Sequence, residues 1–307
     1  MGVSHHIGLE IAERIFRVVE IQQQDRHATI LRADVYPTAH DYSSPLLFEL
    51  PFDGRIARDF ITDLAAIFLN DSVYAGSVSV VLPSVLPLVS MLPVDRVIPA
   101  GTQRALLEWE CETLAGYGPE RRLSILTHPV DDGGRTLAVA LPETSVAFLR
   151  ATCEHLTLDL AAIETDHFVM ENVLRLLYPH ETEGGFGVLG LYPDHCSAGV
   201  HSGDRYLGFR HIAITHRHQY AAQAVHLLES IPGYHDRTSP LRLFAYGPAA
   251  DDALLDALGG VFGEPIIRCV PLAGADAPSS LRDAMQRQGE RDFDVPAAAA
   301  LLGASCA

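Results

Sequence analysis

The order of β-rich and helical segments repeats once along this chain of 307 residues. Residues 7–21 and 28–35 contain three runs rich in branched and apolar side chains, separated by polar residues, which predicts a three-stranded β-meander. A second set of three such runs covers residues 186–214. Because helical and strand patterns alternate after each meander, we expect an α/β protein built from two similar halves.

Between the two meanders, helical and strand spacings of the apolar residues alternate. In residues 55–70, Phe60 and Leu64 fall on one face of a helix. The residues that follow predict a strand, a helix, two strands, a helix, a strand and a helix, in that order: 77–82, 102–115, 122–130, 136–142, 143–156, 160–166 and 167–178. Thr102 is placed to cap the helix at 102–115, and Gly116 is placed to end it.

The second meander is followed by a helix, a strand, a helix and a strand: residues 216–230, 242–247, 251–262 and 265–272. Residues 273–294 show little periodicity, so they are expected to form a surface excursion with one short helix. The chain closes with an apolar helix at 295–305. Its Pro296 lies in the first turn, where proline is tolerated.

The apolar stretch Val78–Val97 carries prolines at 83, 87 and 93, with another at 99. It is the feature of the sequence that a monomeric structure explains least. Proline disfavours helix and the interior of a sheet, so residues 83–99 are expected to be extended. Two interpretations stay open. The stretch is either a buried strand at 77–82 followed by a rigid linker, or an extended segment that pairs with or covers a peptide.

All 22 basic residues are arginine, and they stand against 39 acidic residues, which gives a net charge of −17. Without lysine there is no Schiff-base lysine, no lysine-bound pyridoxal phosphate and no P-loop lysine. Affinity for a phosphate backbone comes mainly from clustered positive charge, so the balance also argues against DNA or RNA as a partner.

The five cysteines are scattered along the sequence without any CxxC pair, which favours reduced thiols over a disulfide framework. The first residues lack the basic start and apolar run of a signal peptide. The apolar residues 78–92 are interrupted by proline and are shorter than the roughly 20 residues that cross a bilayer. We therefore expect a cytoplasmic protein.

The sequence resembles the actin-like superfamily, and within it most of all the PilM type, the cytoplasmic actin-like proteins of type IV pilus machines. Five segments carry the resemblance in order: GLEIAERIFRVVEI, ETSVAFLRATCEHLTLDLAAIETDHFVMENVL, FGVLGLYPDHCSAGVHSGDRYLGFRHIAI, RLFAYGPAADDALLDAL and VPAAAALLGAS. The resemblance implies two ribonuclease-H-like halves with an inserted α/β subdomain. On this scheme residues 1–82 begin domain I, 83–164 form the insert, 165–180 form the return helix of domain I, and 181–307 form domain II.

The resemblance also implies where a nucleotide would bind: two phosphate loops and an adenosine turn, at Glu10, Ala12, Glu13, Gly190, Tyr192 and Gly247. In the family the first loop carries Asp, Gly and a small hydroxyl residue. A glycine lets backbone N–H groups approach a phosphate, whereas Glu13 places negative charge beside the anion. We therefore expect ATP binding to be weak or lost, with no catalytic residue assigned.

The functional expectation from the resemblance is a scaffold of a type IV pilus or related secretion machine. It would dock on the cytoplasmic segment of an inner-membrane protein and so associate peripherally with the inner membrane. Whether it forms a homo-oligomer stays open. One alternative is an active ATPase or small-molecule kinase of the same superfamily that uses Glu10, with Asp194 as the second carboxylate.

A further alternative is a histidine-rich metal hydrolase, because imidazole, thiolate and carboxylate are common zinc ligands. The candidate ligands gather in one region: Asp194, His195, Cys196, His201, His211, His216 and His218. On the expected strands, however, His195 and Cys196 point to opposite faces. No metal site is assigned, and no G-x-S-x-G motif supports a serine hydrolase.

Overall fold

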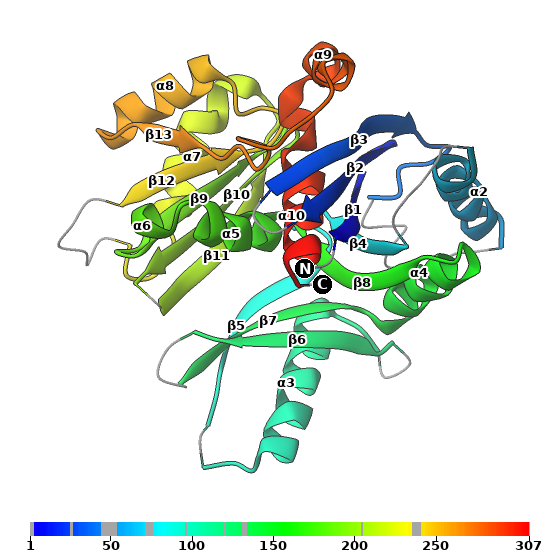
Figure 1. Cartoon of the computed structure of the whole chain (residues 1–307). Helices are drawn as coiled ribbons and strands as arrows, with labels where there is room; N and C mark the ends of the chain where they lie inside the picture. Colours follow the sequence, from blue (N-terminus) through cyan, green and yellow to red (C-terminus); the bar gives the residue numbers. More distant parts are fainter. Residues whose placement is uncertain are drawn as a thin grey trace.

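The computed structural model describes residues 3–24, 27–43, 54–70, 76–95, 97–118, 121–130, 134–203, 205–234 and 241–306. Within these residues the strands form three sheets, two of five strands and one of three (Figure 1). The expected turn residues 131–133 and Asp204 lie outside the described residues. No helix in the described part is long and apolar enough to cross a membrane.

The first sheet has the strand order β3-β2-β1-β4-β8. Its strands are β1 (Val3–Ala12), β2 (Ile15–Gln24), β3 (His27–Pro37), β4 (Ser77–Leu82) and β8 (Asp159–Thr165). The first three form the expected antiparallel meander, and β4 and β8 continue it in parallel. One face is covered by α2 (Gly54–Asn70) and α4 (Glu143–His155), whose apolar residues Phe60, Leu64 and Leu149 are buried against it.

The second sheet repeats this plan in the order β11-β10-β9-β12-β13. Its strands are β9 (Phe186–Leu191), β10 (His195–Ser202), β11 (Arg205–Ala213), β12 (Arg242–Tyr246) and β13 (Ile266–Arg268). The helices α7 (Tyr220–Glu229), preceded by the 3₁₀ turn Arg217–Gln219, and α8 (Asp252–Phe262) cover one face. The last strand is shorter than the expected 265–272.

Two helices lie between the two five-stranded sheets: α5 (Asp166–Leu177), which is green in Figure 1, and α10 (Asp294–Cys306), which is red. The four-residue α6 (Pro179–Thr182) follows α5. The alanine-rich α10 packs so closely on β1 that a methyl group on Gly8 would fall 1.8 Å from the carbonyl oxygen of Pro296. The cluster around these helices holds Val19 from the first sheet and Val188 from the second, so both halves share one core.

The third sheet has the order β5-β7-β6 and carries α3 (Ala100–Ala115) on one face (Figure 1). Its strands are β5 (Leu88–Pro93), β6 (Leu123–Pro129) and β7 (Arg135–Pro142). The sequence missed β5. This strand pairs antiparallel with β7 at the edge of the sheet, where a proline such as Pro93 is tolerated. The linker interpretation of residues 83–99 is therefore wrong for 88–93.

One further expectation for this region needs correction, and another stays a prediction. The helix α3 begins at Ala100 after Pro99, and Thr102 lies inside it and does not cap it; Gly116 ends it with φ 67°, as expected. The range 83–164 was expected to be one insert, but its last strand, β8, pairs in parallel with β4 of the first sheet. The division into domains stays a prediction, and the separate three-stranded sheet lies within residues 88–142.

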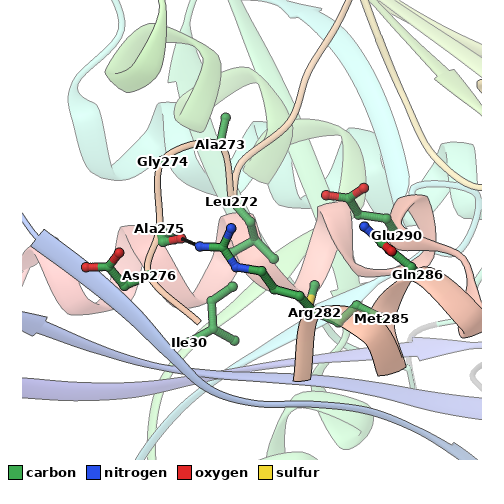
Figure 2. Close-up of a pocket in the computed structure, with 10 residues that line it drawn as sticks. All are labelled: Ile30, Leu272, Ala273, Gly274, Ala275, Asp276, Arg282, Met285, Gln286 and Glu290. Carbon is green, nitrogen blue, oxygen red and sulfur yellow. Dashed lines mark hydrogen bonds between the residues drawn. The ribbon is translucent and has the colours of Figure 1, made fainter. Parts of the chain in front are cut away.

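Residues 273–294 do not form a simple surface excursion, although the expected short helix is present as α9 (Ser279–Gln288). The loop before α9 crosses to the edge strand β3, where Ile30 N donates to Asp276 O at 2.7 Å and Asp276 N donates to Ala28 O at 2.9 Å. Figure 2 shows this loop around Ile30, beside a cavity of about 430 Å³. After α9, the 3₁₀ segment η2 (Glu290–Phe293) buries Phe293 in the shared core. The segment thus fastens the second half to the first.

Candidate functional site

A cavity of about 760 Å³ lies between the two halves; we call it the cleft. The first half contributes the β1–β2 turn, Arg17 and the residues after β3 and β4. The second half contributes the β9–β10 turn and part of β11. The polar side chains that line the cleft are Glu13, Arg17, Asp41, Ser43, Tyr192, Asp194, His195, His211 and Asp292.

An ion-pair cluster of three residues closes one end of the cleft. Arg17 Nη1 lies 3.3 Å from Glu10 Oε2, and Arg17 Nη2 lies 3.8 Å from Asp292 Oδ1. Burial raises the pKa of Glu10 to about 7, against the lowering effect of the Arg17 guanidinium. Arg17 is thus the cation of a buried cluster that contains two acidic groups, and β1, β2 and η2 each supply one member.

The β9–β10 turn forms the facing wall of the cleft. The Tyr192 ring stacks on the His195 ring, with centroids 4.4 Å apart and planes 8° apart. His195 Nδ1 lies 2.7 Å from Asp194 Oδ1, and this hydrogen bond lowers the pKa of Asp194. Burial and the carboxylate of Asp166 raise the pKa of Tyr192 well above its usual value. A hydrogen bond between the Tyr192 hydroxyl and the Asp166 side chain contributes to this rise of the Tyr192 pKa. His195 Nε2 is buried and has no hydrogen-bond partner in the described part of the chain.

Comparison with known proteins gives matches by structure alone. No protein family model matches the sequence, and no curated protein matches it. Among solved structures, a chain of the "PilM-PilN type IV pilus biogenesis complex" is similar with a TM-score of 0.73 and 15% identity, over 97% of this chain and 98% of that one. A Bacteroides thetaiotaomicron protein "with actin-like ATPase fold and unknown function" has a TM-score of 0.53 and 8% identity, over 87% and 91%. The chain has an actin-like fold.

The six positions assigned from the resemblance gather at one end of this actin-like cleft, but only Ala12, Glu13 and Tyr192 line it. Glu10 lies behind the wall in its pair with Arg17. Gly190 packs inside the second half, where a methyl group would fall 2.4 Å from Ser197 Oγ and 2.5 Å from Tyr246 Oη. Gly247 has φ 100° and abuts the carbonyl of Leu191.

Sequence reasoning missed Arg17 and Asp292. The first could have been found, because a tight turn at Glu13 and Arg14 places Glu10 directly opposite Arg17 in the hairpin, and the register confirms this pairing. Asp292 had no comparable signal. It reaches the cleft only because the segment after α9 returns to the first half.

The cleft residues do not fit the triphosphate that the fold family implies. Phosphate sites need free N–H donors and cations. Here the backbone N–H of Glu13 already donates to Ser43 Oγ at 2.7 Å, and Arg17 is paired with acidic groups. Asp194, the second carboxylate that the kinase alternative would need, is bonded to His195.

A buried polar network connects α5 to β10. His167 Nδ1 lies 3.0 Å from Ser197 Oγ, and His167 Nε2 lies 3.1 Å from Glu171 Oε1. The residue types are those of a serine-hydrolase triad, but the two ring nitrogens have exchanged partners, since in such a triad Nε2 faces the serine and Nδ1 the carboxylate. Ser197 and His167 are both 0% exposed, so no substrate could reach the hydroxyl. We interpret this network as structural.

The same network includes His201, one of the histidines considered as a metal ligand in the sequence analysis. His201 Nε2 lies 3.2 Å from Glu171 Oε2, and Arg175 Nη2 donates to His201 Nδ1 at 2.7 Å. Since Arg175 has no acceptor, His201 carries its proton on Nε2 and faces the carboxylate with it. Although burial opposes it, the His201 and His167 rings lower the pKa of Glu171 to about 2. Among the described residues, no group of three or more His, Cys, Asp or Glu side chains is placed to hold a metal ion.

A second large cavity, of about 510 Å³, lies between the three-stranded sheet and α5; we call it the groove. Its apolar residues are Leu126, Leu137, Val139, Ile163 and Phe168. Its polar lining residues are His128, Glu164, Thr165, Glu171, Asn172, Arg175, His201 and Tyr206. A trough that combines apolar side chains with placed polar groups is a typical binding surface for a ligand or an extended segment.

Proposed function

We propose that this actin-like protein is a scaffold of a type IV pilus or related secretion machine. The observation that carries the proposal is the structural match to a chain of the PilM–PilN complex, which spans 97% of this chain and 98% of the other. The match covers nearly the whole of both chains, so it also takes in most of the region of this chain that forms the three-stranded sheet, residues 88–142. Fold alone does not fix function, so the proposal needs a direct test.

A scaffold role agrees better with the cleft than an ATPase role does. Transfer of a phosphoryl group depends on cations and donors held around the phosphates. In this cleft the guanidinium of Arg17 is shared by Glu10 and Asp292, and Glu13 adds negative charge at the hairpin tip. We therefore propose that the nucleotide pocket is degenerate and that the fold keeps its shape without ATP.

We further propose that the chain docks, on the cytoplasmic side, on a segment of an inner-membrane partner through the groove. The apolar side chains Leu126, Val139 and Phe168 offer contacts for an extended apolar segment. Leu126 is 60% exposed, although it lies on a strand that faces the groove, so its burial by a partner would be favourable. Among the polar lining residues, Arg175 is exposed and can donate to main-chain carbonyls of such a segment.

The test is deletion of the gene in the source organism, with surface pili counted by electron microscopy and secreted proteins compared. The scaffold proposal expects loss of pili or of secretion, restored by the wild-type gene. Normal pili and normal secretion in the deletion strain would refute it.

Two matched variants then test the groove. Leu126→Glu places a charge in the groove, whereas Leu106→Glu places one on α3, where Leu106 is 44% exposed and does not line the groove. Both proteins should fold, because both side chains are exposed. We expect Leu126→Glu to fail in complementation and Leu106→Glu to succeed; equal activity of the two variants would refute docking at the groove.

A further inference from the structure

The strand β6 forms an open edge of the three-stranded sheet. In the described part of the chain it pairs with β7 alone, and β7 lies between β5 and β6 (Figure 1). The other edge strand, β5, lies beside β11 of the second half. The edge strand β3 of the first sheet is covered by main-chain hydrogen bonds with Asp276. The structure thus shows a neighbour for β3 and for β5, and none for the outer side of β6 among the described residues.

Main-chain hydrogen bonds at both ends of β6 show which of its groups bond to β7. Glu143 N donates to Arg122 O at 2.9 Å before the strand, and Val130 N donates to Arg135 O at 3.1 Å after it. Both contacts continue the register of the β6–β7 ladder. In an antiparallel ladder, hydrogen-bonded pairs alternate with non-hydrogen-bonded pairs, so these two contacts fix the pattern between them.

The alternation divides β6 into two sets of residues. The residues whose main-chain groups bond to β7 are Ser124, Leu126 and His128. The residues whose N–H and C=O groups point away from β7 are Leu123, Ile125 and Thr127. The outer side of β6 therefore presents a row of donors and acceptors to another strand.

The residues of β6 do not protect this edge. Natural sheets block such edges with charged side chains, prolines or bulges. The sequence of β6, LSILTHP, has no Asp, Glu or Arg, and its proline is the last residue. Leu126 is 60% exposed, and Thr127 and His128 are exposed as well. The edge is therefore suited to accept a further strand.

The charges beside the edge favour a second copy of the same chain as the source of that strand. A cavity of about 180 Å³ between α3 and β6 is lined by Arg104 and Glu108 from the helix and by Ile125 and Thr127 from the strand. The Arg104 and Glu108 side chains are 77% and 43% exposed. A twofold axis at the edge would bring Arg104 of each copy toward Glu108 of the other, so the surface is complementary to itself.

We propose that the protein forms a twofold dimer in which β6 pairs antiparallel with β6 of a second copy. The axis passes at Leu126, and Ile125 exchanges main-chain hydrogen bonds with Thr127 of the second copy. The exposed Leu126 side chains of the two copies then lie side by side, in a non-hydrogen-bonded pair with Cα atoms about 4.5 Å apart. The two three-stranded sheets become one sheet, with both α3 helices on the same face. This inference goes beyond the scaffold function and does not depend on it.

The first experiment is sedimentation equilibrium of the full chain at micromolar concentrations. We expect a mass of twice the 33.4 kDa of one chain. Thr127→Pro removes an N–H that points outward and leaves the β6–β7 ladder intact, so it should weaken the dimer about tenfold or more. The matched control, Thr127→Ala, keeps this N–H and should change the dimer affinity by less than about threefold. Leu126 belongs to the groove as well, whereas Thr127 does not line it, so these variants leave the docking surface unchanged.

A pair of cysteine variants tests the register, and it decides the question if Thr127→Pro does not fold. Leu126→Cys places two thiols across the axis, at a Cα separation that a disulfide bridges. In Ser124→Cys the two thiols are too far apart, because Ser124 lies opposite His128 of the second copy. Both variants carry Cys306→Ser, and the other four cysteines are buried. Mild oxidation should link the Leu126→Cys chains and leave the Ser124→Cys chains single.

Three results would overturn the proposal. The first is a chain that stays monomeric over the whole concentration range. The second is a folded Thr127→Pro variant that dimerises as tightly as the wild type, which would place the contact elsewhere. The third is equal cross-linking of Leu126→Cys and Ser124→Cys. The number of pili in the deletion strain bears on none of these results, so the scaffold proposal and the dimer fail separately.

Discussion

Gly199 on β10 faces Glu171 on α5 so closely that a methyl group on the glycine would fall 2.2 Å from Glu171 Oε1. The same methyl group would fall 2.4 Å from His167 Nε2. The backbone of Gly199 does not require glycine for its dihedral angles, since its φ is not positive. The absence of a side chain therefore lets the buried carboxylate and its two histidines fit between α5 and the second sheet.

Gly199→Ala should lower the free energy of unfolding by about 1–3 kcal/mol, because the buried carboxylate and ring have to move apart to admit a methyl group. Urea unfolding measures the change. The matched control is Gly260→Ala on α8, where nothing lies within 4 Å of the added methyl group and alanine favours the helix by about 0.5–1 kcal/mol. Equal stability of the two variants would contradict the close contact at Gly199.

Because the pKa of Glu171 is lowered in the folded chain, the free energy of unfolding should decrease as the pH falls. The Glu171 pKa falls from 4.5 to about 2 in the folded chain, so the folded state favours the ionised form by on the order of 3 kcal/mol. This contribution is present above about pH 4.5, where the unfolded chain is also ionised, and is lost as the pH falls toward 2. Glu171→Gln should unfold more easily at pH 7 and should lose less stability than the wild type between pH 5 and pH 3. Parallel pH profiles in urea unfolding would contradict the assignment.

The pair Glu10 and Arg17 should show strong coupling. Arg17→Met leaves the buried carboxylate of Glu10 without its nearest cation and should cost about 3–5 kcal/mol of unfolding free energy. The double variant Glu10→Gln, Arg17→Met removes both charges and should recover most of that loss. A double-mutant cycle by chemical denaturation measures the coupling, and simple additivity would show that the two groups act independently.

Residues 273–276 cross to β3, and Asp276 pairs with it through backbone hydrogen bonds. We therefore expect a substitution that alters the backbone of Asp276 to loosen β3 locally, and one that alters only its side chain to leave β3 unchanged. Asp276→Pro removes the N–H that donates to Ala28 O, at a cost of about 1 kcal/mol or more. It should also speed hydrogen exchange at the Ile30 amide, which donates to Asp276 O. Asp276→Ala keeps the backbone and should leave the exchange rate nearly unchanged. Equal protection of Ile30 in both variants would mean that the crossing does not hold the edge strand.

Much of the fold follows from local patterns. The alternation of residues 7–21 gave both strands of the first hairpin and its turn, and the helical spacing of Phe60 and Leu64 gave α2. These predictions succeed because a strand or helix with one buried face must repeat its apolar residues with the period of that element. The hairpin also fixes Glu10 opposite Arg17, because register follows from the turn.

Other features were decided only by the tertiary structure. The sequence around β5 reads as a proline-rich linker, and it becomes a strand because β7 offers it an edge to pair with. Asp292 joins Arg17, and Asp276 joins β3, across more than 240 residues of sequence, where no local period carries information. His167 is likewise an ordinary helix residue until Ser197 and Glu171 surround it in the core. The sequence by itself determined most of the elements and their apolar faces. Which polar groups meet in the cleft, the network and the groove depends on long-range packing of the two halves.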